Sequence, residues 1–392
     1  MNSVNYLIGS ENIIDTPISV FDEDACAFVG ELSTEILKSP LARAYPDLSA
    51  LAFWGRKASL NKMKQDFGNT ADRIGRGLCF HIAPSNIPIN FAFSYLFSLL
   101  AGNANVVRLP SQTYPQVDAF CSTFAELIKN YPEIEKRTAF IRYSRESEMT
   151  AVISAQADVR MIWGGDDTIA FMKSIPVSPR CVDIAFADRY SIALLDGKAV
   201  LDAGDTQIQR LIENFYNDTY LMDQNACSSP QIILWQNDSE NARDRFWSRL
   251  ADYAGKKYFL QDAVAVDKYM SLCEESISNE SLKSARRMGN LLYRAELKAL
   301  TPDIVNHRGR GGFFYEYALN NWEELFAVVT DKFQTITCFG IDTESLQTAV
   351  IKAHLKGIDR IVPVGKAMDI GAVWDGHDLI RELSRIIKVE RF

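Results

Sequence analysis

Cys227 is the residue best suited to covalent chemistry, because the side chains around it are small. It lies within residues 222–230 (MDQNACSSP), directly before the apolar run Gln231–Gln236. Small neighbours leave room for a substrate to reach the sulfur, and Pro230 ends any preceding helix and fixes the entry into a strand. A thiolate in this setting is a nucleophile for acyl transfer, whereas an inert buried thiol would give the same pattern. Neither His nor Lys adjoins Cys227, so a residue distant in sequence must activate it.

Two further segments join an expected strand to an expected helix. In residues 81–88 (HIAPSNIP), Asn86 either caps the helix or donates its side-chain amide to a developing oxyanion. In residues 163–168 (WGGDDT), Gly164 and Gly165 allow a cofactor to approach the backbone closely. Ligands of open parallel sheets bind at this kind of junction. A single Gly-Gly turn is common, so the second segment carries little weight alone.

Neither a metal site nor a disulfide framework is indicated by the cysteines and histidines. The seven cysteines are scattered without a CxxC pair, and the four histidines form no HxxH or HxxxH pair. Structural zinc sites and disulfide-rich folds need closer or regular spacing. We therefore expect no metal and a reducing, cytoplasmic setting.

The composition is that of a soluble globular protein. The chain has 392 residues and a net charge of −8, with 47% hydrophobic and 23% charged residues. An acidic chain without a long basic run is a poor candidate for non-specific binding to nucleic acid. The most apolar segment, Ile87–Ala101, is too short to span a bilayer, which needs about 20 residues. The N-terminus lacks the pattern of a signal peptide.

Alternating strands and helices predict an α/β fold with two doubly wound domains. The first 70 residues are expected to be helical, and strand–helix alternation follows. Such alternation implies crossover connections and parallel sheets covered on both faces. We expect three parts. Residues 1–190 form N-terminal helices and a Rossmann-like cofactor-binding domain, and residues 191–370 form a second domain that carries the nucleophilic Cys. Residues 371–392 form a C-terminal segment. We predict a loop or extended arm over Lys283–Phe314 and a strand at Leu325–Thr330.

Several segments, in this order along the chain, resemble the aldehyde dehydrogenase superfamily. Residues 84–88 (PSNIP) resemble its Pro-Trp-Asn-Phe-Pro segment, and residues 101–111 (AGNANVVRLPS) resemble its Ala-Gly-Asn-Thr-Val-Val-Leu-Lys-Pro-Ser segment. Residues 163–166 resemble its cofactor turn, residues 224–227 its nucleophile segment, and residues 331–334 (DKFQ) its Glu-x-Phe-Gly segment. The resemblance implies an active site in the cleft between the two domains.

A closer resemblance is to the LuxC-type acyl-CoA reductases, the fatty-acid reductases of bacterial bioluminescence. It spans roughly Leu51 to Leu383. The segments that carry it are residues 53–57 (FWGRK), 227–231 (CSSPQ), 332–335 (KFQT), 357–365 (GIDRIVPVG) and 374–379 (WDGHDL).

Three positions depart from the wider superfamily. Its adenosine-ribose Lys falls on Leu109, with Arg108 one position earlier, and the second glycine of its cofactor turn falls on Ala170. Its general-base Glu falls near Asp183. Oxidation to an acid needs a base that activates water, whereas a reductase loses product if water attacks the acyl-enzyme, so this departure favours reduction.

The resemblance implies a mechanism and assigns residues to it. Cys227 attacks an acyl-CoA or acyl-protein thioester, and Asn86 with the backbone N–H of Cys227 stabilises the oxyanion. NADPH then reduces the acyl-enzyme to the fatty aldehyde, with Phe333 near the nicotinamide. The residues expected to bind the cofactor are Arg108, Pro110, Ser111, Gly164, Gly165 and Phe333.

Other activities and partners stay open at this point. One alternative is a superfamily reductase acting on an acyl phosphate or a short acyl-CoA, and another is a non-catalytic acyl-carrying scaffold subunit. An acyl-protein synthetase partner and a homo-oligomer are implied by the resemblance. Residues 308–312 and 373–392 are the candidate contacts, or else a solvated loop and a terminal helix.

Overall fold

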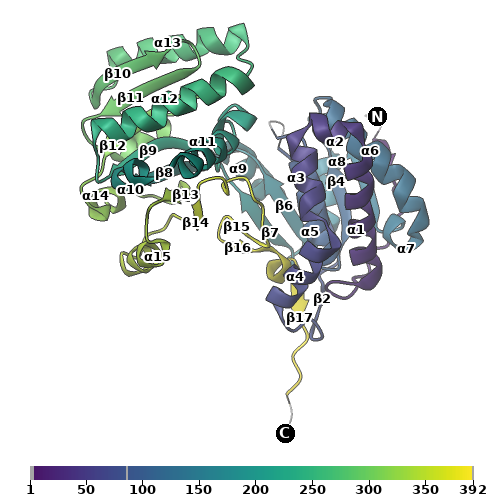
Figure 1. Ribbon diagram of the computed structural model, residues 1–392. Coiled ribbons are helices and arrows are strands. Elements are labelled where there is room, and N and C mark those ends of the chain that lie inside the picture. Colours follow the sequence, from purple (N-terminus) through teal and green to yellow (C-terminus); the bar gives the residue numbers. More distant parts are fainter. Residues whose placement is uncertain (1–3, 85–86, 391–392) are drawn as a thin grey trace. The chain divides into compact units, whose positions relative to one another are not determined.

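Two compact units make up the chain in the computed structural model, which describes residues 4–84 and 87–390 (Figure 1). Unit 1 comprises Met1–Ala187 and Ile370–Phe392, and unit 2 comprises Asp188–Asp369. The segment Ile370–Phe392 thus returns to the unit that contains the N-terminus. There it pairs with unit 1 through a short antiparallel strand, with Ser384 opposite Gly75.

Unit 1 is built on a six-stranded sheet in the order β1-β5-β4-β3-β6-β7. All neighbours are parallel except β1, which runs antiparallel to β5. Because β4 and β5 lie on one side of β3 while β6 and β7 lie on the other, the connections reverse direction between β3 and β6. The strands of unit 1 are β1 (Asn5–Ile8), β2 (Arg73–Gly75), β3 (Leu78–Ile82), β4 (Ala104–Arg108), β5 (Thr138–Arg142), β6 (Val159–Trp163), β7 (Val182–Phe186), β15 (Val373–Trp374), β16 (His377–Asp378) and β17 (Ser384–Ile386).

Helices cover both faces of this sheet. Strand β3 shows why, since Cys79 packs into one core cluster while Leu78 and Phe80 pack into another. Successive side chains of a strand point to opposite faces, so a strand buried throughout needs a layer on each side. The helices of unit 1 are α1 (Glu23–Lys38), α2 (Pro40–Ala44), α3 (Pro46–Trp54), α4 (Lys57–Phe67), α5 (Asn90–Leu100), α6 (Pro115–Leu127), α7 (Pro132–Glu135), α8 (Met149–Gln156), α9 (Asp166–Ser174) and α16 (Leu379–Glu382), with a 3-10 turn η1 (Ile128–Asn130).

Unit 2 repeats the plan with a seven-stranded sheet in the order β10-β11-β12-β9-β8-β13-β14. Only β10 is antiparallel to its neighbour. The strands are β8 (Tyr190–Asp196), β9 (Pro230–Gln236), β10 (Leu282–Met288), β11 (Leu292–Leu297), β12 (Phe313–Ala318), β13 (Phe333–Phe339) and β14 (Arg360–Pro363). The helices are α10 (Gly197–Asp202), α11 (Asp205–Thr219), α12 (Glu240–Lys257), α13 (Asp262–Ser278), α14 (Trp322–Phe326) and α15 (Thr343–Lys352), with 3-10 turns η2 (Tyr220–Met222) and η3 (Pro302–Asn306).

The two faces of this second sheet have separate cores. One core joins Leu195, Ile233 and Trp235 of the strands to α10, α11 and α12. The other joins the alternate strand residues, such as Ile192 and Leu234, to α13, α14 and α15. The predicted α/β, doubly wound class is therefore confirmed for both sheets.

Three expectations about elements are wrong. Strand β1 (Asn5–Ile8) lies within the first 70 residues, which the sequence pattern predicts to be helical, and it pairs with β5 at the edge of the sheet. The basic stretch expected as a loop or arm over Lys283–Phe314 instead begins with the hairpin β10–β11, in which exposed Lys283, Arg286 and Arg287 line the edge strand. Charged edge strands resist pairing with other chains, so the basic pattern is compatible with a strand. The strand predicted at Leu325–Thr330 is the end of a short helix followed by a turn. Asn321 caps that helix, and an apolar run this short does not distinguish a buried helix from a strand.

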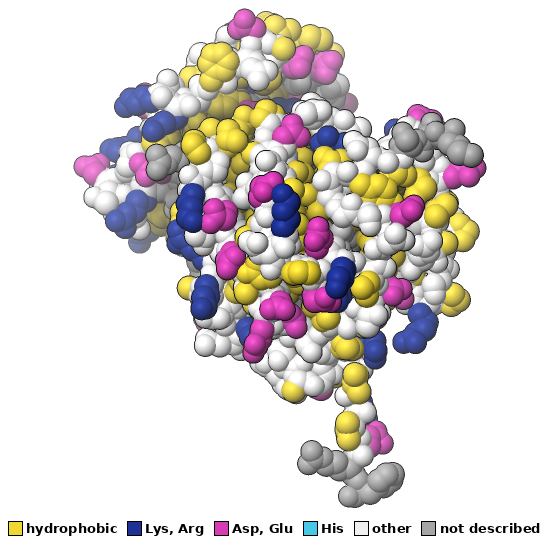
Figure 2. Space-filling view, turned by 90° about the vertical axis from the view of Figure 1, so that its right-hand side faces the viewer, with side chains coloured by type: hydrophobic (Ala, Val, Ile, Leu, Met, Phe, Trp, Pro, Cys, Tyr) yellow, Lys and Arg dark blue, Asp and Glu magenta, His cyan; other side chains and the backbone are white. Residues whose placement is uncertain are grey.

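Positive and negative side chains are interspersed on the surface. On the face shown in Figure 2, Lys and Arg side chains stand among Asp and Glu side chains instead of forming one block. Within the described part of the chain, no helix is both long and apolar enough to cross a bilayer.

Candidate active site

The site in unit 2 forms at the amino ends of neighbouring parallel strands. Cys227 lies just before β9, Asp188 just before β8, Arg308 ahead of β12 and Lys332 just before β13. These four strands are adjacent in the order β12-β9-β8-β13, so their preceding segments are brought to one edge. The usual ligand edge of such sheets is the carboxyl one. The nucleophile candidate thus lies at the edge that the general rule does not favour.

Cys227 occupies a tight, half-buried loop. The turn η2 ends at Asp223 and Gln224, both of which have left-handed backbones with φ of 51° and 63°. The thiol is part-buried, its Sγ lies 3.9 Å from Oδ1 of Asp188, and its backbone carbonyl accepts a hydrogen bond of 2.6 Å from Ser191 Oγ. The loop therefore presents the sulfur beside a carboxylate while its backbone is tied to β8.

Two glutamines fasten this loop to the segment of residues 308–312. Gln224 is 2% exposed; its Nε2 donates to the carbonyls of Pro230 and Phe313, and its Oε1 accepts from the Gly312 N–H. Gln231 donates to the Gln224 carbonyl and accepts from the Gly309 N–H. A buried amide satisfied in this way fixes the backbone on both sides of it.

Glycines are required where the two segments meet. Gly312 has a φ of +90°, and a Cβ there would lie 2.3 Å from the carbonyl oxygen of Leu291. A Cβ on Gly309 would lie 1.8 Å from the carbonyl oxygen of Phe313. The sequence Arg308-Gly309-Arg310-Gly311-Gly312 is thus a closely packed support for the nucleophile loop, held further by Lys268, whose Nζ donates to the Gly311 carbonyl at 2.6 Å.

Arg308 binds the carboxylate next to Cys227. Its Nη1 and Nη2 lie 3.0 Å from Oδ1 and Oδ2 of Asp188, a bidentate arrangement. The guanidinium also donates through Nε to the Val305 carbonyl and lies over the ring of Tyr190. Sequence reasoning missed both Asp188 and Arg308 as site residues. Asp188 lies 39 positions before Cys227, and Arg308 lies 120 positions after Asp188, so neither is near Cys227 in the sequence.

The other cysteines include four thiols that are unsuited to nucleophilic chemistry. Burial raises the pKa of Cys79, Cys121 and Cys338 to about 12. Burial also raises the pKa of Cys181, to about 11. A thiol with so high a pKa is almost wholly protonated at neutral pH.

In unit 1 the expected cofactor residues gather at the carboxyl edge of the sheet. Ile82 pairs with Arg108 on one side and with Ile162 on the other, so the ends of β3, β4 and β6 adjoin where the connections reverse direction. Arg108 ends β4 half-exposed with its guanidinium 4.7 Å from the ring centroid of Tyr143, Pro110 is buried and Ser111 is exposed. Asn86 lies outside the described residues.

The turn at Gly164 and Gly165 is only partly suited to phosphate. No atom lies within 4 Å of a Cβ built on Gly165, so its surface is open to a ligand. The helix α9 begins directly after it with Asp166 and Asp167. These two carboxylates offset the positive end of the helix dipole and weaken its attraction for an anion.

The residue that resembles the general base is engaged elsewhere. Asp183 accepts two hydrogen bonds of 2.7 Å from the guanidinium of Arg160, which is 1% exposed. His81 is a core residue, since its ring bonds to Ser94 and Asn105 and burial lowers its pKa to about 4. Phe333 is 2% exposed and packs edge to face on Tyr190.

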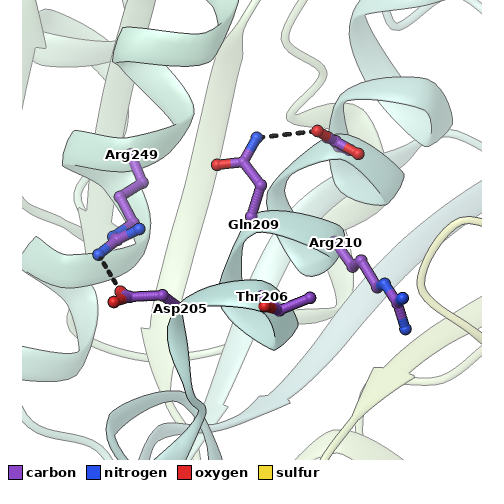
Figure 3. Close-up of a pocket in the computed structure, with 6 residues that line it drawn as sticks. Asp205, Thr206, Gln209, Arg210 and Arg249 are labelled. Atoms are coloured by element: carbon purple, nitrogen blue, oxygen red, sulfur yellow. Dashed lines mark hydrogen bonds and ion pairs between the residues drawn. The ribbon is translucent and has the colours of Figure 1, made fainter.

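Neither a cluster of metal ligands among the described residues nor the surface hollow along α11 adds to this picture. No group of three or more possible metal ligands occurs among the residues that the structure describes. Figure 3 shows an open hollow along α11, where an ion pair joins Arg249 to Asp205. None of the residues lining it was singled out by its chemistry.

Comparison with known proteins identifies the family. The sequence pattern of the family described as acyl-CoA reductase (LuxC) matches residues 49–260, more than half of the chain. The chain belongs to this acyl-CoA reductase family. It is therefore an aldehyde-forming oxidoreductase, and the resemblance found in the sequence is confirmed.

Two curated relatives of this acyl-CoA reductase have related names. A long-chain acyl-protein thioester reductase from Vibrio harveyi is 23% identical, with 92% of this chain and 76% of that protein aligned. Long-chain acyl-protein thioester reductase 2 from Photobacterium leiognathi is 28% identical over 80% of this chain, and the match spans only 63% of that relative.

The fold of the acyl-CoA reductase is that of aldehyde dehydrogenases. A solved NAD-dependent benzaldehyde dehydrogenase from Corynebacterium glutamicum superimposes with a TM-score of 0.60 at 12% identity, covering 92% of this chain and 82% of that one. The expected aldehyde-dehydrogenase-like architecture is thereby confirmed.

Proposed function

We propose that this acyl-CoA reductase converts a long-chain fatty acyl thioester, carried by CoA or by a protein, into the fatty aldehyde. NADPH is the proposed reductant and Cys227 the proposed nucleophile. The observation that carries the proposal is the position of the Cys227 sulfur, part-buried and 3.9 Å from the Asp188 carboxylate in a loop fixed by buried amides. The names of the two relatives support a thioester on a protein as one donor.

The nucleophile loop accounts for the first half of the reaction. The sulfur of Cys227 bonds to the thioester carbon and the thiol of the donor departs, which leaves an S-acyl-cysteine. Rigid attachment of the loop through Gln224 and Gln231 keeps the sulfur in one place during this exchange. Asn86 and the Cys227 N–H are the proposed oxyanion donors, each worth about 3 kcal/mol in acyl transfer.

The carboxyl edge of unit 1 is the proposed cofactor site. The open surface at Gly165 leaves room for close approach, Gly164 packs tightly against Thr168, and Arg108 supplies a cation at the end of β4, on the other side of β3. Pro110 and Ser111 lie in the segment that follows the end of β4. Bound NADPH supplies the hydride. Because Phe333 is buried, we assign to it the positioning of the start of β13.

The ion pair between Asp183 and Arg160 favours reduction of the acyl-enzyme over its hydrolysis. The Asp183 carboxylate accepts two hydrogen bonds from the buried Arg160, and only 22% of its side chain is exposed, so water has little access to it. Asp183 is therefore not available to activate water against an acyl-enzyme. Release of aldehyde without accompanying acid is therefore the expected outcome of turnover.

The test is a product assay with matched donors. The protein is incubated with NADPH and one long-chain acyl-CoA, one short-chain acyl-CoA or one acyl phosphate, and aldehyde and acid are both quantified. The proposal expects the highest rate with the long-chain thioester and aldehyde as the main product. A higher rate with the acyl phosphate or with the short-chain acyl-CoA would show that the proposed substrate is wrong. If none of the donors yields aldehyde, the whole proposal is overturned.

Partners follow from the same chemistry. A protein that carries or transfers activated acyl groups is the proposed donor, and an acyl-protein synthetase is the class of enzyme that would load it. We also propose a homo-oligomer. Sedimentation of the purified chain, alone and with an acyl-protein synthetase, tests both.

A further inference from the structure

The carboxylate beside the nucleophile has no counterpart among the residues that the resemblance assigned. Asp188 is half-exposed, with 47% of its side chain accessible, and it is the first residue of unit 2. Its Oδ1 lies within hydrogen-bonding range of the Cys227 sulfur at 3.9 Å. Asp183, the residue that matches the superfamily base, is held by Arg160 instead.

From this geometry we infer that Asp188 is the proton acceptor for Cys227 and that Arg308 is the positioning residue that aims it. The inference rests on the proposed function, because it concerns the same acyl transfer. The proton of the Cys227 thiol passes to Oδ1 of Asp188 as the sulfur bonds to the thioester carbon. When the carbon–sulfur bond to the donor breaks, the departing thiolate takes that proton, and Asp188 is again a carboxylate.

Arg308 is held too firmly to be a chance surface partner. Both of its terminal nitrogens bond to Asp188, its Nε bonds to the Val305 carbonyl, and its guanidinium lies 5.7 Å from the centre of the Tyr190 ring. Isolated surface ion pairs contribute little, but bidentate pairs anchored by further contacts define an orientation. The packing of the glycines that follow Arg308 fixes its backbone as well.

The charges around Asp188 are mainly positive. Besides Arg308, the Lys332 ammonium lies 3.4 Å from the Asp188 carbonyl oxygen, and the adjacent Arg189 pairs with Asp359. These cations offset the repulsion that a carboxylate would exert on a neighbouring thiolate. Asp188 can therefore accept a proton from the sulfur without suppressing the nucleophile.

Two measurements on Asp188→Asn separate proton transfer from a structural role. Without a proton acceptor, acylation of Cys227 by a long-chain acyl-CoA should slow by about 100-fold. Without the negative charge, the pH midpoint for alkylation of Cys227 by iodoacetamide should fall by about one unit. A variant that merely disturbs the loop would impair both reactions together.

Replacing Arg308 should shift the pH midpoint for alkylation of Cys227 in the opposite direction. In Arg308→Gln the carboxylate loses its cation, so the alkylation midpoint should rise by about one pH unit while acylation slows. Arg308→Lys should restore the alkylation midpoint, because it keeps the charge, but only part of the acylation rate, because it loses the bidentate fork. The matched controls are Asp205→Asn and Arg249→Gln, which break the ion pair seen in Figure 3 and should change neither measurement.

The outcomes also distinguish this inference from the proposed function. Absence of an acyl adduct on wild-type Cys227 contradicts the proposed function and the inference with it. If wild-type Cys227 is acylated and Asp188→Asn is acylated at the same rate, the inference is wrong and the proposed function stands. Parallel loss of acylation and alkylation in Asp188→Asn also overturns it, since that is the signature of a disturbed loop.

Discussion

Removing the hydrogen bonds of Gln224 should loosen the nucleophile loop by a predictable amount. Gln224→Met keeps the length of the side chain and its left-handed backbone, so backbone strain is nearly unchanged. It removes three buried hydrogen bonds, to Pro230, Phe313 and Gly312. At about 1 kcal/mol for each bond, the expected loss is about 3 kcal/mol. The loss appears either in the free energy of opening the loop or in the free energy of unfolding the whole chain.

The assay combines unfolding in urea with the rate of Cys227 alkylation under native conditions. If the loop opens locally, alkylation should accelerate while the urea midpoint barely moves, and if the loop is part of the global fold, the midpoint should fall. Gln209→Met is the matched control, because its amide donates to Glu213 on the exposed face of α11 and loss of that bond should cost less than about 0.5 kcal/mol. A Gln224→Met protein that matches this control in both measurements would refute the proposed clamp.

Three further predictions concern other parts of the molecule. Burial raises the pKa of Asp218 to about 7, so between about pH 4 and 7 the folded state keeps a proton that the unfolded state releases. The free energy of unfolding should therefore fall as pH rises through this range. Urea titrations of Asp218→Asn should show a smaller fall. Asp183→Asn should lower stability by leaving Arg160 buried without its anion, while the ratio of aldehyde to acid stays that of the wild type. NADPH should raise the melting temperature in a concentration-dependent way, and Arg108→Ala should reduce that shift; equal shifts in both proteins would remove Arg108 from the cofactor site.

Much of the fold was predictable because it depends on local patterns. Buried strands such as Leu78–Ile82 and Val159–Trp163 are apolar runs interrupted by one polar residue each and separated by helical periodicity, and that pattern predicts parallel sheets. The wrongly predicted elements lie where the pattern of apolar and charged residues fits more than one type of structure. The basic residues of β10 are on an exposed edge of the sheet, where charged side chains are compatible with a strand. Leu325–Thr330 is apolar because its side chains pack into the core, and it does not pair as a strand.

The candidate site was only half predictable. Cys227 is visible in the sequence because the small residues around it are adjacent to it. Asp188 and Arg308 are not, because strand order alone brings the segments before β8 and β12 to either side of β9. The resemblance also could not show that Asp183 is occupied by Arg160, since that contact depends on the pairing of β6 with β7.

The most direct test of the account is whether Cys227 carries the acyl group. The protein is mixed with a long-chain acyl-CoA and no reductant, its intact mass is measured, and the modified peptide is identified. The account predicts one added acyl group on the peptide that contains Cys227, its disappearance on addition of NADPH, its absence in Cys227→Ala, and its retention in the control Cys273→Ala. An unmodified wild-type protein, or an adduct that persists in Cys227→Ala, would contradict it.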